Sequence, residues 1–539
     1  MTTDCTAEAG SPVATTTVGN VTGRRLAALV IAGIAGVTTV ACSAGDSGVT
    51  AVRSSPVTTE PASTDPPATT DPPTTEPDTT EPDTTVSPTR SDPDGIGDVL
   101  YPELGNPGID VVDVTVAIRY DPEVDTVAGA VTLLIDATDE RDEFTLDAVG
   151  LDVSGVTVDG EPVVFGVEER ELRITPPTSL TTGDRIEVTV TYTATPDAAA
   201  SAGLPNGWFH TDGGSYVLNE PDGGRTWMPS NDHPSDKSTW TFEITVPTGT
   251  TAVANGDLVS SGPATDGPGD TWVWREDDPM PTYLIQLLTG DYEVIESTTA
   301  DGLPVIDVAL RNDVERMRPY FASIQPQIDF FEEQFGPYPL DRYGLAFTDS
   351  FGGLAMETQG RSLFSRDDFP GDVGYVQELL LAHELAHQWY GNAVTPGVWQ
   401  DIWLNESFAT YAQWLWLDHI GLQPLDDAAA SALQGRQGGG SAGGFGGAAS
   451  PTGTPTVDDL FGFNTYDGGA VVLEALRRTI GDEPFAETLQ RWVSENIGTS
   501  VATADFIALA ERVSGQDLTL FFDSWLYASE IPGAYPSFA

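Results

Sequence analysis

The spacing of apolar residues changes once along this chain, near residue 298, and this change constrains the fold more than any other feature of the sequence. Before it, segments such as "VDVTVAIRYDP", "DRIEVTVTYTA" and "TWTFEITVP" alternate apolar and polar residues or carry β-branched runs, and Gly, Pro and Asp separate them. Such alternation is typical of strands with one buried face. Residues 98–297 are therefore predicted to form an N-terminal, mainly antiparallel β-domain.

After the change, segments such as "VGYVQELLLAHELAHQWY", "ESFATYAQWLWLDHI" and "GGAVVLEALRRTI" have helical periodicity, with Gly or Pro at their ends. Residues 298–539 are therefore predicted to form a mostly helical domain, which makes the fold class α+β. Residues 435–450, "GRQGGGSAGGFGGAAS", predict a mobile glycine-rich insertion. They lack the Lys-Ser/Thr pair of a phosphate-binding loop.

Residues 1–42 have the pattern of an export signal. Arg24 and Arg25 precede an apolar, charge-free run of about 15 residues, which is short for a membrane span. Ala41-Cys42 at the end of that run resembles a bacterial lipoprotein signal. We therefore expect export to the cell surface of a bacterium and a lipid anchor on Cys42, with plain secretion or an uncleaved anchor as alternatives.

Residues 43–97 are rich in Thr, Pro, Asp and Glu and contain almost no apolar residues that could be buried. Such a segment cannot offset the entropy of ordering, and its prolines favour extended conformations. It is predicted to be a disordered stalk that separates the folded part from a membrane or cell wall.

The charge and the cysteine content limit the possible partners and metal ligands. The formal net charge is −59, which excludes nucleic acid as a partner and favours cationic ligands. The two cysteines, Cys5 and Cys42, both lie in the export segment, so the mature fold is expected to have no disulfide. A metal ion would have to be bound by His, Asp or Glu.

His383, Glu384 and His387 form the pattern H-E-x-x-H in a chain that has 5 histidines in all. Residues four apart lie on one face of a helix, so both imidazoles can reach one ion. The helix is predicted to run from an Asp372 cap to Gly391. A pair of histidines satisfied inside a buried helix is the alternative reading.

The third ligand is predicted to be Glu406, at the start of the next predicted helix and capped there by Asn405. Two imidazoles and one carboxylate are the ligand set of a catalytic zinc, which keeps one position open for water. One Zn²⁺ per chain is therefore expected. Glu384 is then placed to accept a proton from the attacking water as general base.

The segment "HELAHQWYGNAVTPGVWQDIWLNESFATY" resembles the zinc-site signature of the gluzincin aminopeptidases, the aminopeptidase N family. "GGLAMETQG" resembles the G-x-M-E-N motif of that family, "YDGGAVVLEAL" its Y-x-K-G segment, and "NEPDGGRTWMPSNDHPSDKSTWTFEITVP" a stretch of its β-domain. The resemblance spans about residues 101–527. It implies a thermolysin-like catalytic domain, and a short form without the long C-terminal helical domain and with a more open cleft.

The resemblance also implies roles for single residues. Tyr466 would stabilise the oxyanion, and Glu220 and Glu357 would bind the α-ammonium of the substrate. The expected substrate-binding residues are Glu220, Gly353, Ala355, Met356 and Glu357.

Two positions depart from the family pattern. Thr358 stands where the family has Asn, which puts substrate-backbone contacts in doubt. Gly468 stands where it has Lys, a change expected to affect packing. Arg225 and Lys237 match family positions and are expected to form structural ion pairs.

The leading hypothesis is a zinc aminopeptidase that releases N-terminal residues from peptides with a free amine. A zinc endopeptidase would use the same H-E-x-x-H but has no use for amine-binding carboxylates. A non-catalytic, surface-displayed peptide-binding protein with a retained zinc site is the third hypothesis. Structural zinc usually has four protein ligands, and no fourth candidate occurs at the H-E-x-x-H spacing. This hypothesis also leaves Glu384 without a role.

Overall fold

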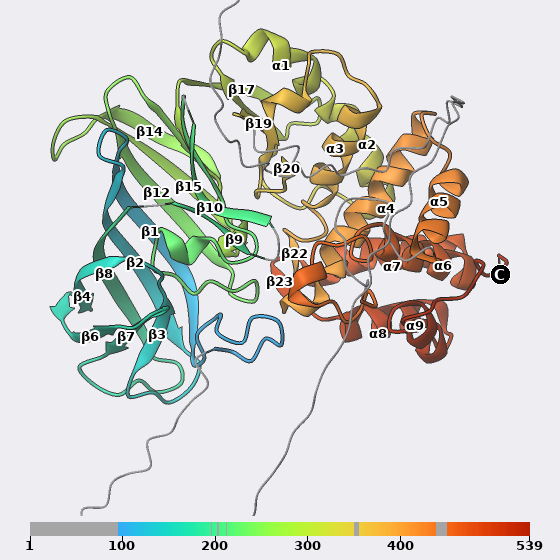
Figure 1. Ribbon diagram of the computed structural model, residues 1–539, viewed down its shortest axis with the longest axis horizontal. Helices are drawn as coiled ribbons and strands as arrows, with labels where there is room; N and C mark the ends of the chain where they lie inside the picture. Colours follow the sequence, from blue (N-terminus) through green and yellow to red (C-terminus); the bar gives the residue numbers. More distant parts are fainter. Residues whose placement is uncertain are drawn as a thin grey trace, which may run out of the picture. The chain divides into compact units, whose positions relative to one another are not determined.

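The computed structural model describes residues 95–195, 197–201, 204–211, 213–349, 355–437 and 450–538, which belong to one compact unit (Figure 1). The predicted export segment with Cys42, the predicted stalk as far as residue 94, Gly353 and residues 438–449 of the predicted insertion lie outside the described residues.

An eight-stranded sheet forms the largest part of the first half of the fold, in the strand order β14-β15-β12-β1-β2-β8-β4-β5. Its neighbouring strands are antiparallel except β1 and β12, which are parallel. Strand β8 shows why these residues form strands, because Ile186, Val188, Val190 and Tyr192 alternate into the core. The strands are β1 (Ile109–Asp121), β2 (Thr126–Ala137), β4 (Asp152–Val158), β5 (Glu161–Pro162), β8 (Arg185–Ala194), β12 (Ser238–Val246), β14 (Asp257–Pro263) and β15 (Asp270–Met280).

Two smaller antiparallel sheets complete this half and share its hydrophobic core. One has the order β13-β16-β11-β10-β9, and β11 leads directly into the segment that carries Glu220. The other has the order β3-β7-β6. The strands are β3 (Phe144–Asp147), β6 (Val164–Val167), β7 (Glu171–Thr175), β9 (Ala198–Ser201), β10 (Leu204–Thr211), β11 (Gly214–Leu218), β13 (Thr251–Ala254) and β16 (Leu287–Gly290).

The second half combines a five-stranded mixed sheet with helices around a second hydrophobic core. The order is β17-β18-β19-β21-β20, so β20 is an edge strand. The strands are β17 (Tyr292–Thr298), β18 (Pro304–Leu310), β19 (Leu345–Thr348), β20 (Ala355–Met356) and β21 (Ser362–Ser365), with the separate pair β22 (Val394–Pro396) and β23 (Thr499–Val501). The helices are α1 (Val314–Phe321), α2 (Ile324–Phe335), α3 (Tyr375–Ala386), α4 (Trp403–His419), α5 (Leu425–Gln437), α6 (Asp467–Ile480), α7 (Asp482–Asn496), α8 (Thr503–Ser514) and α9 (Thr519–Trp525).

The α+β class predicted from the sequence is confirmed, because a β-rich half precedes a mostly helical half. The hairpin of β17 and β18 joins residues on both sides of the predicted border at residues 297 and 298. The domain borders therefore stay a prediction.

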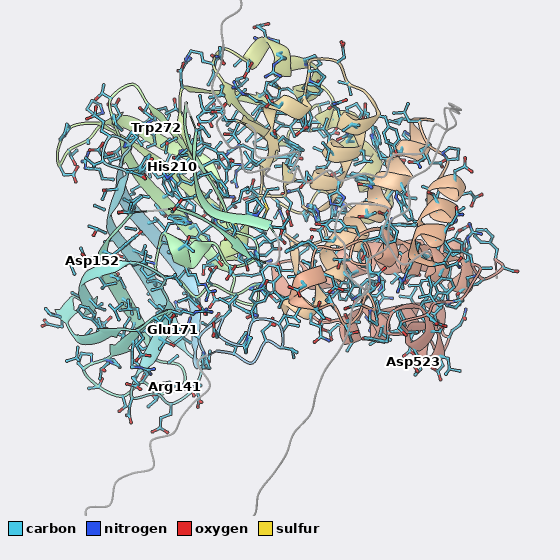
Figure 2. All side chains as sticks on the ribbon, viewed as in Figure 1. Arg141, Asp152, Glu171, His210, Trp272 and Asp523 are labelled. Carbon is cyan, nitrogen blue, oxygen red and sulfur yellow. The ribbon has the colours of Figure 1, made fainter. Side chains whose placement is uncertain are left out.

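Acidic side chains such as Asp152 in the β-rich half and Asp523 in the helical half are exposed (Figure 2). Within the described part of the chain, no helix combines the length and the apolar character that crossing a membrane requires.

Candidate active site

Helix α3 carries the first histidine and the glutamate of the H-E-x-x-H pattern, and His387 follows directly as its C-cap residue. The predicted helix limits are wrong at both ends. The N-cap is Gly374 and not Asp372, because Gln377 Oε1 accepts the Gly374 N–H at 3.1 Å. The helix ends at Ala386, and the chain then turns towards Gly391.

Helix α4 packs against α3 and carries Glu406 in its first turn. Its N-cap residue is Ile402, so the prediction that Asn405 caps this helix is wrong. Asn405 instead lies inside the helix and turns its side chain towards the site. Its Oδ1 accepts a hydrogen bond from His387 Nδ1, and its Nδ2 donates to Glu357 Oε1 at 3.0 Å.

The three predicted metal ligands converge. Glu406 Oε2 lies 3.1 Å from His383 Nε2 and 3.4 Å from His387 Nε2. One ligand atom from each residue lies within 4.8 Å of the other two, and all three residues are buried. This set of donors fits the three protein ligands of a catalytic zinc.

Each imidazole is oriented by a hydrogen bond from its other nitrogen. His383 Nδ1 donates to Gln413 Oε1 at 3.0 Å, and His387 Nδ1 donates to Asn405 Oδ1 and to Tyr390 O at 3.2 Å. In the neutral form of each ring, Nε2 is then left with a lone pair for an ion, the arrangement usual for metal-binding histidines. The sequence reading missed Gln413, although two turns of helix place it on the same face of α4 as Glu406.

The site carries more negative than positive charge. Burial and the nearby carboxylates of Glu357 and Glu406 raise the pKa of Glu384 well above its usual range, although His387 opposes the shift. Burial disfavours the charged form of His387, but the same two carboxylates raise its pKa to about 10. Glu384 Oε2 is buried and has no hydrogen-bond partner among the described residues. A bound dication would relieve this excess of buried negative charge, so the residues present fit zinc.

The two carboxylates predicted to bind an amine come from different halves of the fold. Glu220 follows β11 and Glu357 follows β20. One oxygen of each lies within 4.8 Å of the other and of an oxygen of Glu406. Glu220 Oε1 is buried without a described partner, and burial together with the neighbouring carboxylates raises the pKa of Glu220 well above its usual range.

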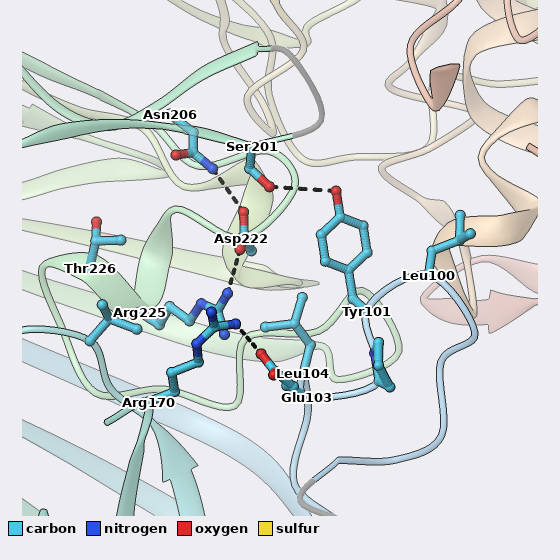
Figure 3. Close-up of a pocket in the computed structure, with 12 residues that line it drawn as sticks. Leu100, Tyr101, Glu103, Leu104, Arg170, Ser201, Asn206, Asp222, Arg225 and Thr226 are labelled. Atoms are coloured by element: carbon cyan, nitrogen blue, oxygen red, sulfur yellow. Dashed lines mark hydrogen bonds and ion pairs between the residues drawn. The ribbon is translucent and has the colours of Figure 1, made fainter. Parts of the chain in front are cut away.

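Hydrogen bonds hold the segment that follows Glu220 in place. Asp222 accepts from Asn206 Nδ2 at 2.9 Å and from the guanidinium of Arg225, so the ion pair predicted for Arg225 is present (Figure 3). These residues also line a cavity of about 490 Å³. Burial disfavours the charged form of Arg225, but the carboxylates of Asp222, Asp232 and Asp147 outweigh it and raise the pKa of Arg225.

The other predicted substrate-binding residues lie on the edge strand β20. Ala355 is half-buried and Met356 is buried, and they pair with Phe364 and Leu363 of β21. Gly353 lies outside the described residues.

Tyr466 is the N-cap residue of α6 and contacts two of the predicted metal ligands. Its hydroxyl donates to Glu406 Oε1 at 3.0 Å, and its ring stacks on His383 with 5.9 Å between the centroids. Gly468, two residues further on, lies close to Asn464, whose Oδ1 would be 2.8 Å from a Cβ atom at that position. The departure at Gly468 therefore has a packing consequence.

Thr358 is buried, and its hydroxyl points into the fold. It accepts a hydrogen bond from Gln286 Nε2 at 2.9 Å and donates to Arg361 O. Through Thr358, the connection between β20 and β21 is therefore joined to Gln286 of the β-rich half.

Comparison with known protein families shows which family this chain belongs to. The family model described as the Peptidase M1 N-terminal domain matches residues 112–284, and that described as the Peptidase family M1 domain matches residues 321–525. The chain belongs to peptidase family M1. The predicted resemblance to the gluzincin aminopeptidases is confirmed.

Solved M1 structures share this fold. An M1 zinc metallopeptidase from Deinococcus radiodurans matches with a TM-score of 0.74 and 28% identity, over 83% of this chain and 99% of that chain. A mutant of a two-domain M1 zinc metallopeptidase bound to L-tryptophan matches with a TM-score of 0.73 and 28% identity, over 82% of this chain and 100% of that chain.

Curated M1 aminopeptidases are longer. Aminopeptidase N of Streptomyces lividans is 25% identical over 463 residues, which cover 78% of this chain and 50% of the relative. Aminopeptidase M1 of Arabidopsis thaliana is 27% identical over 320 residues, which cover 57% of this chain and 36% of the relative. The chain spans about half or less of the length of these relatives.

Proposed function

We propose that this M1 family member is a zinc aminopeptidase that removes N-terminal residues from peptides. The observation that carries the proposal is the position of Glu220 and Glu357 beside Glu406, because two carboxylates next to a predicted zinc ligand can bind the α-ammonium of a peptide. The M1 relatives that bind L-tryptophan or the peptide Tyr-Ser-Ala support this substrate class.

The ion is assigned to His383, His387 and Glu406. Bound there, zinc would supply Lewis-acid activation of water and of the scissile carbonyl. Glu384 accepts the proton of the attacking water and returns it to the leaving amine, a transfer for which its unpartnered Oε2 is available. The hydroxyl of Tyr466 donates a hydrogen bond to the carbonyl oxygen as negative charge develops on it.

The substrate main chain is assigned to β20, which is an edge strand among the described residues and to which an extended peptide can add. The free amine then lies between Glu220 and Glu357. Binding the amine this close to the ion limits cleavage to the first peptide bond. An endopeptidase has no free amine at this place, and a structural zinc site has no use for the unpartnered carboxylate of Glu384.

The test uses aminoacyl amides with a fluorogenic leaving group, each paired with its N-acetylated form. We expect release from the free-amine substrates only, and loss of release when zinc is removed with a chelator and its return when zinc is added back. Equal cleavage of the acetylated forms would overturn the aminopeptidase in favour of an endopeptidase. Activity that survives complete zinc removal would overturn the zinc mechanism.

The proposal extends to location. We infer from the apolar run and Ala41-Cys42 that the chain is exported and anchored through a lipid on Cys42. Mass spectrometry of the mature protein from its bacterial membrane fraction is expected to show a lipid-modified N-terminal peptide that begins at Cys42. The variant Cys42→Ser should lack the lipid. An unmodified mature N-terminus elsewhere in the chain would contradict the anchor.

A further inference from the structure

Side chains of the β-rich half of the fold hold the turn that follows His387. This turn, residues 391–393, accepts hydrogen bonds from Lys237 and Tyr283. Lys237 Nζ donates to Asn392 O at 2.7 Å and to Ala393 O at 3.2 Å. The buried hydroxyl of Tyr283 donates to Gly391 O at 3.0 Å. All three carbonyls of the turn therefore bind side chains of the first half.

The predicted ion pair of Lys237 is wrong, because its described partners are backbone carbonyls. Burial lowers the pKa of Lys237 to about 7, although Asp278 opposes the shift. Lys237 is also the only lysine among 23 basic residues. A compact amine with three donors suits two consecutive carbonyls, whereas the planar guanidinium of arginine suits carboxylates.

The same turn supports Glu357. Asn392 Nδ2 donates to Glu357 O at 2.7 Å, and Gln388 Nε2 donates to the same oxygen at 3.2 Å. Asn405 Nδ2 binds the carboxylate itself. Both the backbone and the carboxylate of Glu357 are therefore held by residues on or beside the segment that follows the metal-binding helix.

The turn has little room to move on its own. Gly391 has φ +118°, and a Cβ atom there would lie 2.0 Å from Asn405 Oδ1. Asn405 in turn orients His387 and binds Glu357. A shift of the turn would therefore displace Asn405 as well as Asn392, and both of them hold Glu357.

We propose that Lys237 and Tyr283 are positioning residues that fix the carboxylate of Glu357 through the 391–393 turn, so that the β-rich half sets the selectivity for a free N-terminal amine. This inference rests on the proposed function, in which Glu357 binds the amine. The described hydrogen bonds of Lys237 and Tyr283 reach the turn and not Glu357 itself, so their effect on Glu357 passes through the turn.

The experiment measures binding without turnover, so every protein in it, including the reference called the wild type, also carries Glu384→Gln, which removes the proposed general base. Isothermal titration calorimetry on the zinc-loaded full chain compares L-leucinamide with N-acetyl-L-leucinamide. In the wild type, only the free amine is expected to bind. Lys237→Met is expected to weaken binding of L-leucinamide about tenfold, the effect of losing hydrogen bonds at a buried site. Tyr283→Phe is expected to act in the same direction, and zinc content should not change in either variant.

A double-mutant cycle separates positioning from general damage to the fold. In a Glu357→Gln background, Lys237→Met should have little further effect, because the carboxylate that it positions is already gone. In a Glu220→Gln background, Lys237→Met should keep its full effect, because the described contacts of the turn lead to Glu357.

Ser500→Ala is the matched control. Ser500 Oγ donates to Pro234 O at 3.2 Å and to Ser235 O at 3.4 Å, so it joins the two halves close to Lys237 without a described side-chain contact to the turn. This variant should bind L-leucinamide as the wild type does.

The outcomes distinguish the two proposals. Unchanged binding of L-leucinamide by Lys237→Met and Tyr283→Phe, or equal losses by Lys237→Met in both backgrounds, would overturn the positioning role alone. A wild type that binds both amides equally would overturn the amine-binding role of Glu357 and the inference with it. Selective binding here, together with no hydrolysis by the chain that retains Glu384, would overturn the proposed enzyme but leave the positioning role standing.

Discussion

Glu384→Gln is expected to lower kcat by about 10²- to 10⁴-fold, the usual contribution of a positioned general base. The glutamine side chain keeps the size of the glutamate but cannot accept a proton at neutral pH. Glu384 is not one of the three predicted ligands, so zinc content should stay at the wild-type level. Steady-state kinetics on a free-amine substrate and metal analysis of the same sample check both expectations.

Glu378→Gln is the matched control for this prediction. Glu378 lies in the first turn of the same helix α3, and its carboxylate accepts from Gln327 Nε2 at 3.1 Å and from Trp416 Nε1 at 2.8 Å, outside the site. This variant should retain the wild-type kcat. A Glu384→Gln enzyme with near wild-type kcat would remove Glu384 from the mechanism.

Glu406→Gln is expected to cause the largest loss of zinc affinity. One oxygen of Glu406 lies close to both imidazole Nε2 atoms, and replacement by an amide removes the negative charge among the three ligands. Asn405→Leu keeps all three predicted ligands and removes the hydrogen bonds of Asn405 to His387 and Glu357. A loss of about 10- to 100-fold is typical when the residue that orients a ligand is replaced. We therefore expect the zinc affinity to fall more for Glu406→Gln than for Asn405→Leu.

Competition with a chromophoric zinc chelator measures this order directly. Activity of Glu406→Gln should be undetectable at zinc concentrations that saturate the wild type. A larger loss of zinc affinity for Asn405→Leu than for Glu406→Gln would show that the third ligand is another carboxylate. A Glu406→Gln variant that binds zinc as tightly as the wild type would show the same. Glu357 would then be the first candidate, because an oxygen of Glu357 lies within 4.8 Å of one ligand atom each of Glu384 and His387.

The limits of helices α3 and α4 could not be predicted from local sequence patterns. The position of the two histidines followed from helical periodicity, which is a property of one segment. The cap residues did not follow from periodicity, because Asp372 and Gly374 are both compatible with a helix start. The hydrogen bond from the Gly374 N–H to the side chain of Gln377 favours Gly374 as the N-cap. Asparagine is also a favourable N-cap residue, but Asn405 lies inside α4, where its side chain contacts His387 and Glu357.

The sequence by itself determined the α+β class and the H-E-x-x-H pair, and it predicted the third ligand to be a carboxylate at the start of the next helix. These depend on periodicity and on spacing along one or two elements, which neighbouring residues specify. Family resemblance supplied the roles of Tyr466, Glu357 and Glu220.

Only the tertiary structure decided which of these residues meet. Glu220 and Glu357 approach Glu406 because the two halves of the fold pack together around the site. Lys237 binds two carbonyls that lie 155 and 156 residues further along the chain, so its own sequence neighbourhood contains no sign of its partners. Contacts at such separation depend on the path of the whole chain, and local spacing carries no information about that path.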